Sequence, residues 1–147
     1  QLNYTTGSGG YANSTTPSIW PSKGVITSPF GSRVDPVTGA ASAFHEGLDI
    51  ADDYGTPIVA TAAGTVTFAG YTEGGYGNLV EIDHGNGFVT RYGHNSAVLV
   101  TPGMSVKQGQ VIALMGSTGK STGAHVHYEV RINGSAVDPM VFLPISN

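Results

Sequence analysis

The sequence contains no cysteine, which excludes disulfide bonds and thiolate chemistry. Any transition-metal site must therefore be built from histidine and carboxylate ligands. Charged residues are also scarce: they make up 11% of the 147 residues, less than half of the roughly 25% that is usual in a soluble domain. The net charge of −4 and the lack of a basic cluster argue against a nucleic-acid partner.

Long hydrophobic runs are missing as well. No apolar run approaches the roughly 20 residues of a membrane-spanning helix, and residues 97–100 (AVLV) are far too short. No signal peptide is visible. The sequence begins at Gln1 without an initiator methionine, so we expect a processed or trimmed piece of a longer precursor.

The composition is that of an ordered β protein of single-domain length. It is 39% hydrophobic, it is rich in Val, Ile, Thr and Tyr, and its 22 glycines and 8 prolines are spread along the chain. Residues 1–19 carry no charge and are rich in Gly, Ser, Thr and Asn. We predict a flexible linker or N-terminal arm over residues 1–19 and a folded domain over residues 20–147.

Short strand-like runs alternate with turn signals through the domain. The expected strands cover residues 64–70, 78–85, 88–94, 110–116 and 125–132. The second and third are joined by a tight turn at residues 84–87 (HGNG), and Asn133-Gly134 closes the last. Residues 138–143 (DPMVFL) allow about one helical turn. The sequence thus predicts an all-β domain, an antiparallel β-sandwich or curled sheet.

Two histidines on one strand draw attention to residues 121–130 (STGAHVHYEV). Side chains alternate between the faces of a strand, so His125 and His127 project together while Val126 and Tyr128 point to the opposite side, where Val126 would be core. A second pair, His45 and Asp49, shares a face if residues 44–51 (FHEGLDIA) are extended.

Together, His45, Asp49 and His127 would make a set of two imidazoles and one carboxylate. Three protein ligands with an open fourth position are typical of catalytic rather than structural zinc sites. Such a site also needs a base to accept a proton and donors to stabilise an oxyanion. His125 and His94, which ends the segment RYGH, are candidates for that work.

Four segments, in this order, resemble the lysostaphin-type (LytM-like) zinc peptidases of bacterial cell walls: HEGLDI, YGNLVEIDHGNGFVTRYGH, VKQGQVIALMGSTGKSTGAHVHYEVR and VDP. The resemblance covers residues 20–143. In that family the first histidine and the aspartate of H-x-x-x-D and the second histidine of H-x-H bind zinc. By resemblance these are His45, Asp49 and His127, while His94 and His125 carry the acid–base and oxyanion work. Asn95 departs from the Leu that many members have after the isolated histidine, with no evident chemical consequence.

The resemblance implies more about fold and function. The fold would be of the duplicated hybrid motif kind, with a groove along one sheet face. The activity would be zinc-dependent hydrolysis of peptide cross-links or stem peptides of peptidoglycan, with one Zn²⁺ per chain. The domain would act as a monomer in an extracellular, periplasmic or cell-envelope location.

Five further side chains could line the substrate groove: Arg33, Tyr71, Tyr76, Asn78 and Tyr92. Tyr and Arg are common at such surfaces, but packing and solvation explain them equally well. Glu129 shares the face of His127, so it either orients an imidazole or is an exposed strand residue. His84 falls in a turn, where a structural or solvent-exposed role is expected.

Two apparent motifs are set aside. HEGLD begins like the helical H-E-x-x-H motif, but Asp49 stands at its end and Glu46 is not expected to act as a general base. GSTGKS resembles a phosphate-binding loop, but Leu114 replaces the glycine that the motif requires, and a strand follows instead of a helix.

Two other functions compete with a peptidase. A catalytically silent relative could bind peptidoglycan or activate another hydrolase, and the complete ligand set argues against it. A histidine phosphotransfer domain could also be a β-sandwich with two histidines, but it would have no need of Asp49.

Overall fold

The computed structural model describes residues 12–32, 44–121 and 123–145. Within them it contains two antiparallel sheets and one short 3₁₀ helix, η1 (Pro139–Val141), at the predicted helical turn. The all-β, antiparallel architecture predicted from the sequence is therefore confirmed. No helix in these residues is long and apolar enough to cross a membrane.

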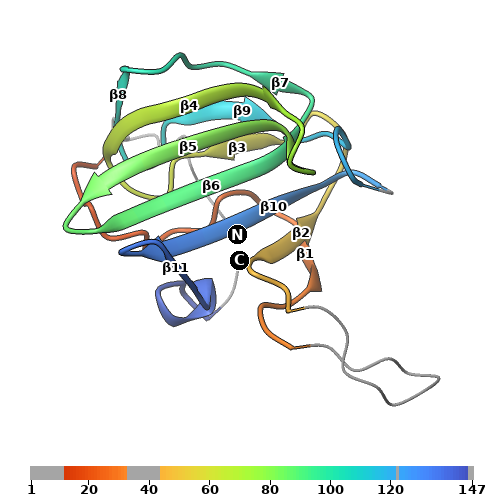
Figure 1. Cartoon of the computed structure of the whole chain (residues 1–147), viewed down its shortest axis with the longest axis horizontal. Helices are drawn as coiled ribbons and strands as arrows, with labels where there is room; N and C mark the ends of the chain where they lie inside the picture. The colour runs from red at the N-terminus through yellow and green to blue at the C-terminus, as the bar shows by residue number, and fades with distance from the viewer. Residues whose placement is uncertain (1–11, 33–43, 122, 146–147) are drawn as a thin grey trace.

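The larger sheet crosses the molecule in Figure 1. Its strand order is β1 (Val25–Ser28), β2 (Leu48–Ala51), β10 (His125–Ile132), β6 (Phe88–Asn95), β5 (Gly77–Gly85), β4 (Gly64–Thr72) and β8 (Ser105–Val106), and β11 (Ser135–Val137) pairs with β10. The smaller sheet has the order β3 (Pro57–Val59), β9 (Val111–Leu114) and β7 (Ala97–Val98).

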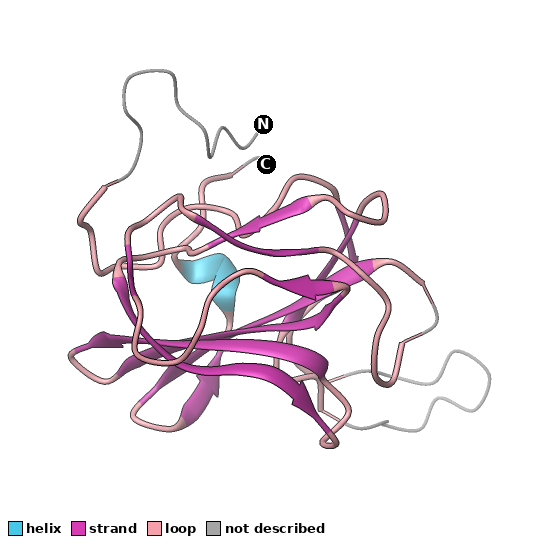
Figure 2. Ribbon diagram, turned by 90° about the horizontal axis from the view of Figure 1, so that it is seen from above, coloured by secondary structure: helices cyan, strands magenta, loops and turns pink. Residues whose placement is uncertain are grey.

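The two sheets form separate layers (Figure 2), and the hydrophobic core lies between them. The larger sheet contributes Val80, Ile82 and Tyr128, while Ile58 and Ile112 come from the smaller one; all five are fully buried. Only one face of the larger sheet is used for this packing. Its opposite face is free to carry polar side chains.

Alternation along β10 divides its side chains as the sequence predicts. Val126 and Tyr128 are fully buried in the core, and His125 and His127 lie on the other face. In β5, Val80 and Ile82 are buried while Asp83 is exposed. The period-two pattern is therefore sufficient to predict which face of these strands carries chemistry.

The turn between β5 and β6 is tighter than the sequence suggests. Asn86 and Gly87 both have positive φ, 54° and 83°, as a two-residue type I′ hairpin requires. His84 therefore does not lie in the turn but in β5, with 4% of its surface exposed. Its Nδ1 is 2.8 Å from the carbonyl oxygen of Ala63, and its Nε2 is 2.7 Å from Oγ1 of Thr90. Its role is structural, and the solvent-exposed alternative is wrong.

The described part of the predicted arm is attached to the domain. Ala12 forms a β-bridge with Gln108, and Gln108 Nε2 donates to Oγ of Ser18 and to the carbonyl of Thr61. Trp20, at the predicted boundary, is buried in the core. Residues 1–11 lie outside the described residues.

Candidate active site

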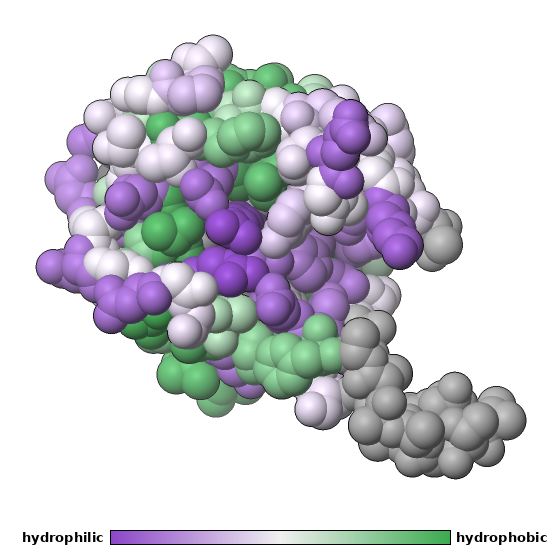
Figure 3. All heavy atoms as spheres, viewed as in Figure 1, coloured by the Kyte–Doolittle hydropathy of each residue, from purple (hydrophilic) through white to green (hydrophobic). Residues whose placement is uncertain are grey.

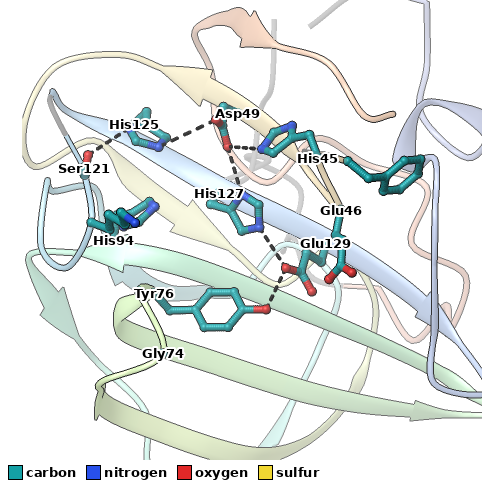
Figure 4. A pocket seen from close by; sticks show the side chains of 13 residues that line it. His45, Glu46, Asp49, Gly74, Tyr76, His94, Ser121, His125, His127 and Glu129 are labelled. Carbon is teal, nitrogen blue, oxygen red and sulfur yellow. Dashed lines mark hydrogen bonds and ion pairs between the residues drawn. The ribbon is translucent and has the colours of Figure 1, made fainter. Parts of the chain in front are cut away.

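An open pocket of about 530 Å³ lies on the polar face of the larger sheet. Hydrophilic side chains gather on this side of the molecule, over β6 and β10 (Figure 3). The pocket is lined by all five residues for which the sequence suggests metal binding or catalysis: His45, Asp49, His94, His125 and His127. They come from β2, β6, β10 and the segment before β2, and Figure 4 shows them around a common space.

Asp49 and His127 are direct register partners in the β2–β10 pair. Oδ1 of Asp49 lies 2.9 Å from Nδ1 of His127 and 3.4 Å from Nε2 of His45. One ligand atom from each of the three residues lies within 4.8 Å of the others. Two imidazole nitrogens and one carboxylate oxygen at this spacing fit a divalent transition metal such as zinc.

Hydrogen bonds to neighbouring groups determine which nitrogen each candidate ligand would offer to a metal. Nδ1 of His45 lies 2.9 Å from the carbonyl oxygen of Pro29, which can only accept, so Nε2 remains for a metal. Nε2 of His127 lies 2.8 Å from Oε2 of Glu129, which leaves Nδ1 facing Asp49. Metal-binding histidines typically have such a second partner, which fixes tautomer and ring orientation.

His94 and His125 are held in the same manner. Nδ1 of His94 donates to the carbonyl of Thr118 (2.7 Å), and Nδ1 of His125 donates to that of Gly123 (2.9 Å). Their ring centroids are 4.6 Å apart. In each ring Nδ1 is engaged by a carbonyl, so Nε2 is the nitrogen left for a bound molecule, as an acceptor in the neutral ring or a donor in the protonated one.

A bulge explains how His94 reaches the pocket. Strict alternation would place His94 on the same face as Tyr92. The register between β5 and β6 shifts between the pairs Val80–Tyr92 and Asn78–Asn95, and His94 has a φ of 67°. This conformation is uncommon for a residue other than glycine, and the 2.6 Å hydrogen bond from the amide of His94 to the carbonyl of Tyr76 holds it.

The same bulge makes the prediction for Tyr92 wrong. Its side chain is fully buried in the core rather than in the groove, and its hydroxyl contacts Thr61 and Thr90. Tyr76 does line the pocket. Tyr71, which is 64% exposed, and Asn78 are not among the described residues that line it. Arg33 lies outside the described residues.

Two glycines near the candidate ligands have a steric role that the sequence alone does not reveal. A Cβ at Gly47 would lie 2.7 Å from the carbonyl oxygen of Tyr128 and 2.8 Å from Cε1 of His127. A Cβ at Gly93 would lie 3.1 Å from the ring of Tyr76. Gly47 therefore gives the His127 ring its space.

Burial and hydrogen bonding determine the charges in the pocket. Burial opposes protonation of His127, but hydrogen bonds to Asp49 and Glu129 outweigh it and raise its pKa to about 9. Burial would raise the pKa of Glu129, but hydrogen bonds from His127, Tyr76 and Arg131 lower it to about 2. Burial lowers the pKa of His94, which favours a neutral imidazole near pH 7.

Glu46 and Glu129 also line the pocket. The Glu46 carboxylate is 2.6 Å from Nη2 of Arg131, so its negative charge is paired. Glu129, for which the sequence left two roles open, is 2% exposed and contacts His127 directly. It is therefore not an exposed strand residue.

The chain is similar to proteins of known family. The pattern of peptidase family M23 matches residues 43–139. The DD-carboxypeptidase/endopeptidase Mpg of Neisseria meningitidis is 50% identical over 120 residues, 81% of this chain and 27% of that protein. The murein hydrolase activator NlpD of Escherichia coli is 41% identical over 125 residues, 85% of this chain and 31% of that protein. The chain thus spans about a third or less of these relatives.

Solved structures support the same relationship. The catalytic domain of the antimicrobial peptidase lysostaphin from Staphylococcus simulans superposes with a TM-score of 0.72 at 32% identity, covering 80% of this chain and 90% of that domain. The lysostaphin-type resemblance and the fold that it implies are therefore confirmed. The chain belongs to peptidase family M23.

Proposed function

We propose that the chain is a zinc-dependent endopeptidase that hydrolyses the peptide part of bacterial peptidoglycan. The observation that carries the proposal is the convergence of His45, Asp49 and His127, with ligand atoms within 4.8 Å of one another, beside two further histidines. His94 and His125 share this pocket and offer Nε2 to a bound molecule. A ligand set with adjacent acid–base groups is what metal-assisted hydrolysis requires.

His45, Asp49 and His127 would hold the zinc ion. When bound, zinc supplies Lewis-acid polarisation of the scissile carbonyl and lowers the pKa of water. His94 or His125 accepts a proton from the attacking water and delivers it to the leaving amine. The other imidazole, when its Nε2 carries a proton, donates a hydrogen bond to the oxygen on which negative charge develops. Their 4.6 Å ring separation lets both reach one peptide group.

An extended peptide suits the site. The pocket is open and lies on the exposed face of a sheet, where a flexible stem or bridge could cross the ligands. Relatives named as a DD-carboxypeptidase/endopeptidase and as a murein hydrolase activator support a wall substrate. We therefore also propose that the domain works in the cell envelope or outside the cell.

The alternative is a silent domain that activates another hydrolase. The activator name of the Escherichia coli relative favours it. The complete set of three ligands and two further histidines favours the enzyme, because an activator has no need of them.

Digestion of several purified peptidoglycans with different cross-links would test the proposal. The zinc-loaded domain should release fragments whose masses identify one cleaved peptide bond, a chelator should abolish release, and His125→Ala should slow it by about 10²–10⁴-fold. Full zinc occupancy without cleavage of any wall type would favour the activator.

A further inference from the structure

Glu129 is a nearly inaccessible carboxylate on a face that is otherwise open to solvent. It lies two residues after His127 on β10, with 2% of its surface exposed. Its register partner on β6 is Arg91. A buried carboxylate is costly unless every lone pair is satisfied, so its surroundings indicate what it does.

Both oxygens of Glu129 are occupied by donors. Oε2 accepts from Nε2 of His127 at 2.8 Å and from the hydroxyl of Tyr76 at 2.7 Å (Figure 4). Oε1 accepts from Nε of Arg131 at 2.8 Å, and Nη1 of Arg91 lies 3.7 Å away. Three side chains thus donate hydrogen bonds to the carboxylate, and of these only His127 is a candidate metal ligand.

The donors are themselves anchored. Nη2 of Arg131 binds the carboxylate of Glu46 at 2.6 Å, next to His45 in the chain. Nη1 of Arg91 donates to the hydroxyl of Tyr76 at 3.2 Å, and Nε of Arg91 binds Glu81 at 2.8 Å. A continuous network therefore joins β5, β6 and β10 with the segment that carries His45.

We propose that Glu129 is the positioning residue for His127, which it holds with the proton on Nε2 and with Nδ1 presented to the metal. The inference rests on the proposed zinc site. An imidazole without this acceptor can change tautomer, which puts the proton on Nδ1, or can turn its ring, which moves Nδ1 away from Asp49; either change stops Nδ1 from binding a metal. Loss of such outer partners typically costs 10–100-fold in metal affinity.

Glu81 provides a matched control. It is a carboxylate on β5 that binds the same Arg91, at 2.8 Å, and also the hydroxyl of Thr67. No contact between Glu81 and a histidine is found among the described residues. Glu81→Gln therefore disturbs the same network without touching a proposed ligand.

The test measures the zinc dissociation constant by competition with a chromogenic chelator. We expect Glu129→Gln to raise this constant about 10–100-fold and Glu81→Gln to change it by less than about 3-fold. Tyr76→Phe, which keeps the carboxylate but removes one donor, should raise it about 2- to 10-fold, the size of one hydrogen bond. This milder variant tests the proposal even if Glu129→Gln fails to fold.

A second readout separates positioning from general stabilisation. In ¹⁵N-edited NMR spectra of the zinc-loaded protein, the Nε2 proton of His127 should be shifted downfield and protected from exchange. This signature should weaken in Glu129→Gln, which replaces the charged acceptor by a neutral amide, and persist unchanged in Glu81→Gln.

Each outcome bears on a separate claim. If the wild type binds zinc and both Glu129→Gln and Tyr76→Phe leave its zinc dissociation constant unchanged, the positioning role alone is overturned. Failure of the wild type to bind zinc would overturn the metal site and the positioning role with it. Glu129-dependent zinc binding without peptide cleavage would support the positioning role and overturn the proposed activity.

Discussion

Oδ1 of Asp49 lies 2.9 Å from Nδ1 of His127 across strands β2 and β10, in which the two residues are directly paired. The distance is set by sheet register rather than by loops, so the site is built on rigid elements. Asp49 is also 3.4 Å from Nε2 of His45 and 3.9 Å from Nε2 of His125. The carboxylate is therefore the point where the proposed ligands meet.

Asp49→Ala should abolish stoichiometric zinc binding. The substitution leaves two imidazoles without the carboxylate between them. We therefore expect the zinc affinity to fall by at least about 100-fold, which is the upper end of the loss seen when only a hydrogen-bond partner of a metal ligand is removed. Zinc content after dialysis measures the effect. Asp53→Ala, in the exposed turn after β2, is the control and should retain one zinc per chain. Full zinc occupancy in Asp49→Ala would refute the assignment of this ligand.

His94→Ala and His125→Ala should keep zinc but lose turnover. Neither residue belongs to the three-ligand cluster, and both offer Nε2 to a bound molecule. General acid–base groups typically contribute about 10²–10⁴-fold, and each variant should lose that much in kcat. His84→Gln, a buried histidine outside the pocket, should retain kcat at pH 8. Loss of zinc from either alanine variant would mean that the roles are divided differently.

Gly47→Ala should weaken the fold and the site together. The added Cβ would lie 2.7 Å from the carbonyl oxygen of Tyr128 and 2.8 Å from Cε1 of His127. Overpacking of this kind costs about 1–3 kcal/mol in the free energy of unfolding. Gly123→Ala is the control, because its Cβ would meet nothing within 4 Å and should change stability by less than about 0.5 kcal/mol. Equal denaturant midpoints for the two variants would contradict this account.

His84 should make the fold sensitive to acid. Burial lowers its pKa below that of an unfolded histidine, although the hydrogen bond to Ala63 opposes the shift. Below about pH 6.5 the unfolded chain therefore binds a proton that the folded chain does not, so stability falls as pH decreases. Between pH 8 and pH 5.5 the thermal midpoint of the metal-free wild type should drop further than that of His84→Gln. Parallel curves would argue against a buried, neutral His84.

The faces of the central strands follow from sequence because alternation is a local rule. The pattern of β10 assigns Val126 and Tyr128 to the core and His125 and His127 to the pocket, as the structure has them. The turn residues Asn86 and Gly87 are also readable, since few residues adopt positive φ. These predictions need no knowledge of distant partners.

The features that could not be predicted from the sequence depend on contacts between residues far apart in the chain. The bulge that turns His94 into the pocket and leaves Tyr92 in the core needs the carbonyl of Tyr76. The role of Glu129 could not be decided because Tyr76, one of its donors, lies 53 residues earlier in the chain. Register and bulges of this kind are set by tertiary pairing, which a single sequence does not display.

The most direct test of the central claim starts from the domain stripped of metal by a chelator. Zinc is added stepwise in the presence of a cross-linked peptidoglycan peptide, and the release of new amino termini is measured. The account predicts no release without metal, a rise as zinc is added and a plateau at one zinc per chain. Asp49→Ala should show no release across the same range. Saturation of the site with zinc and no release of amino termini from any cross-link type would contradict the account.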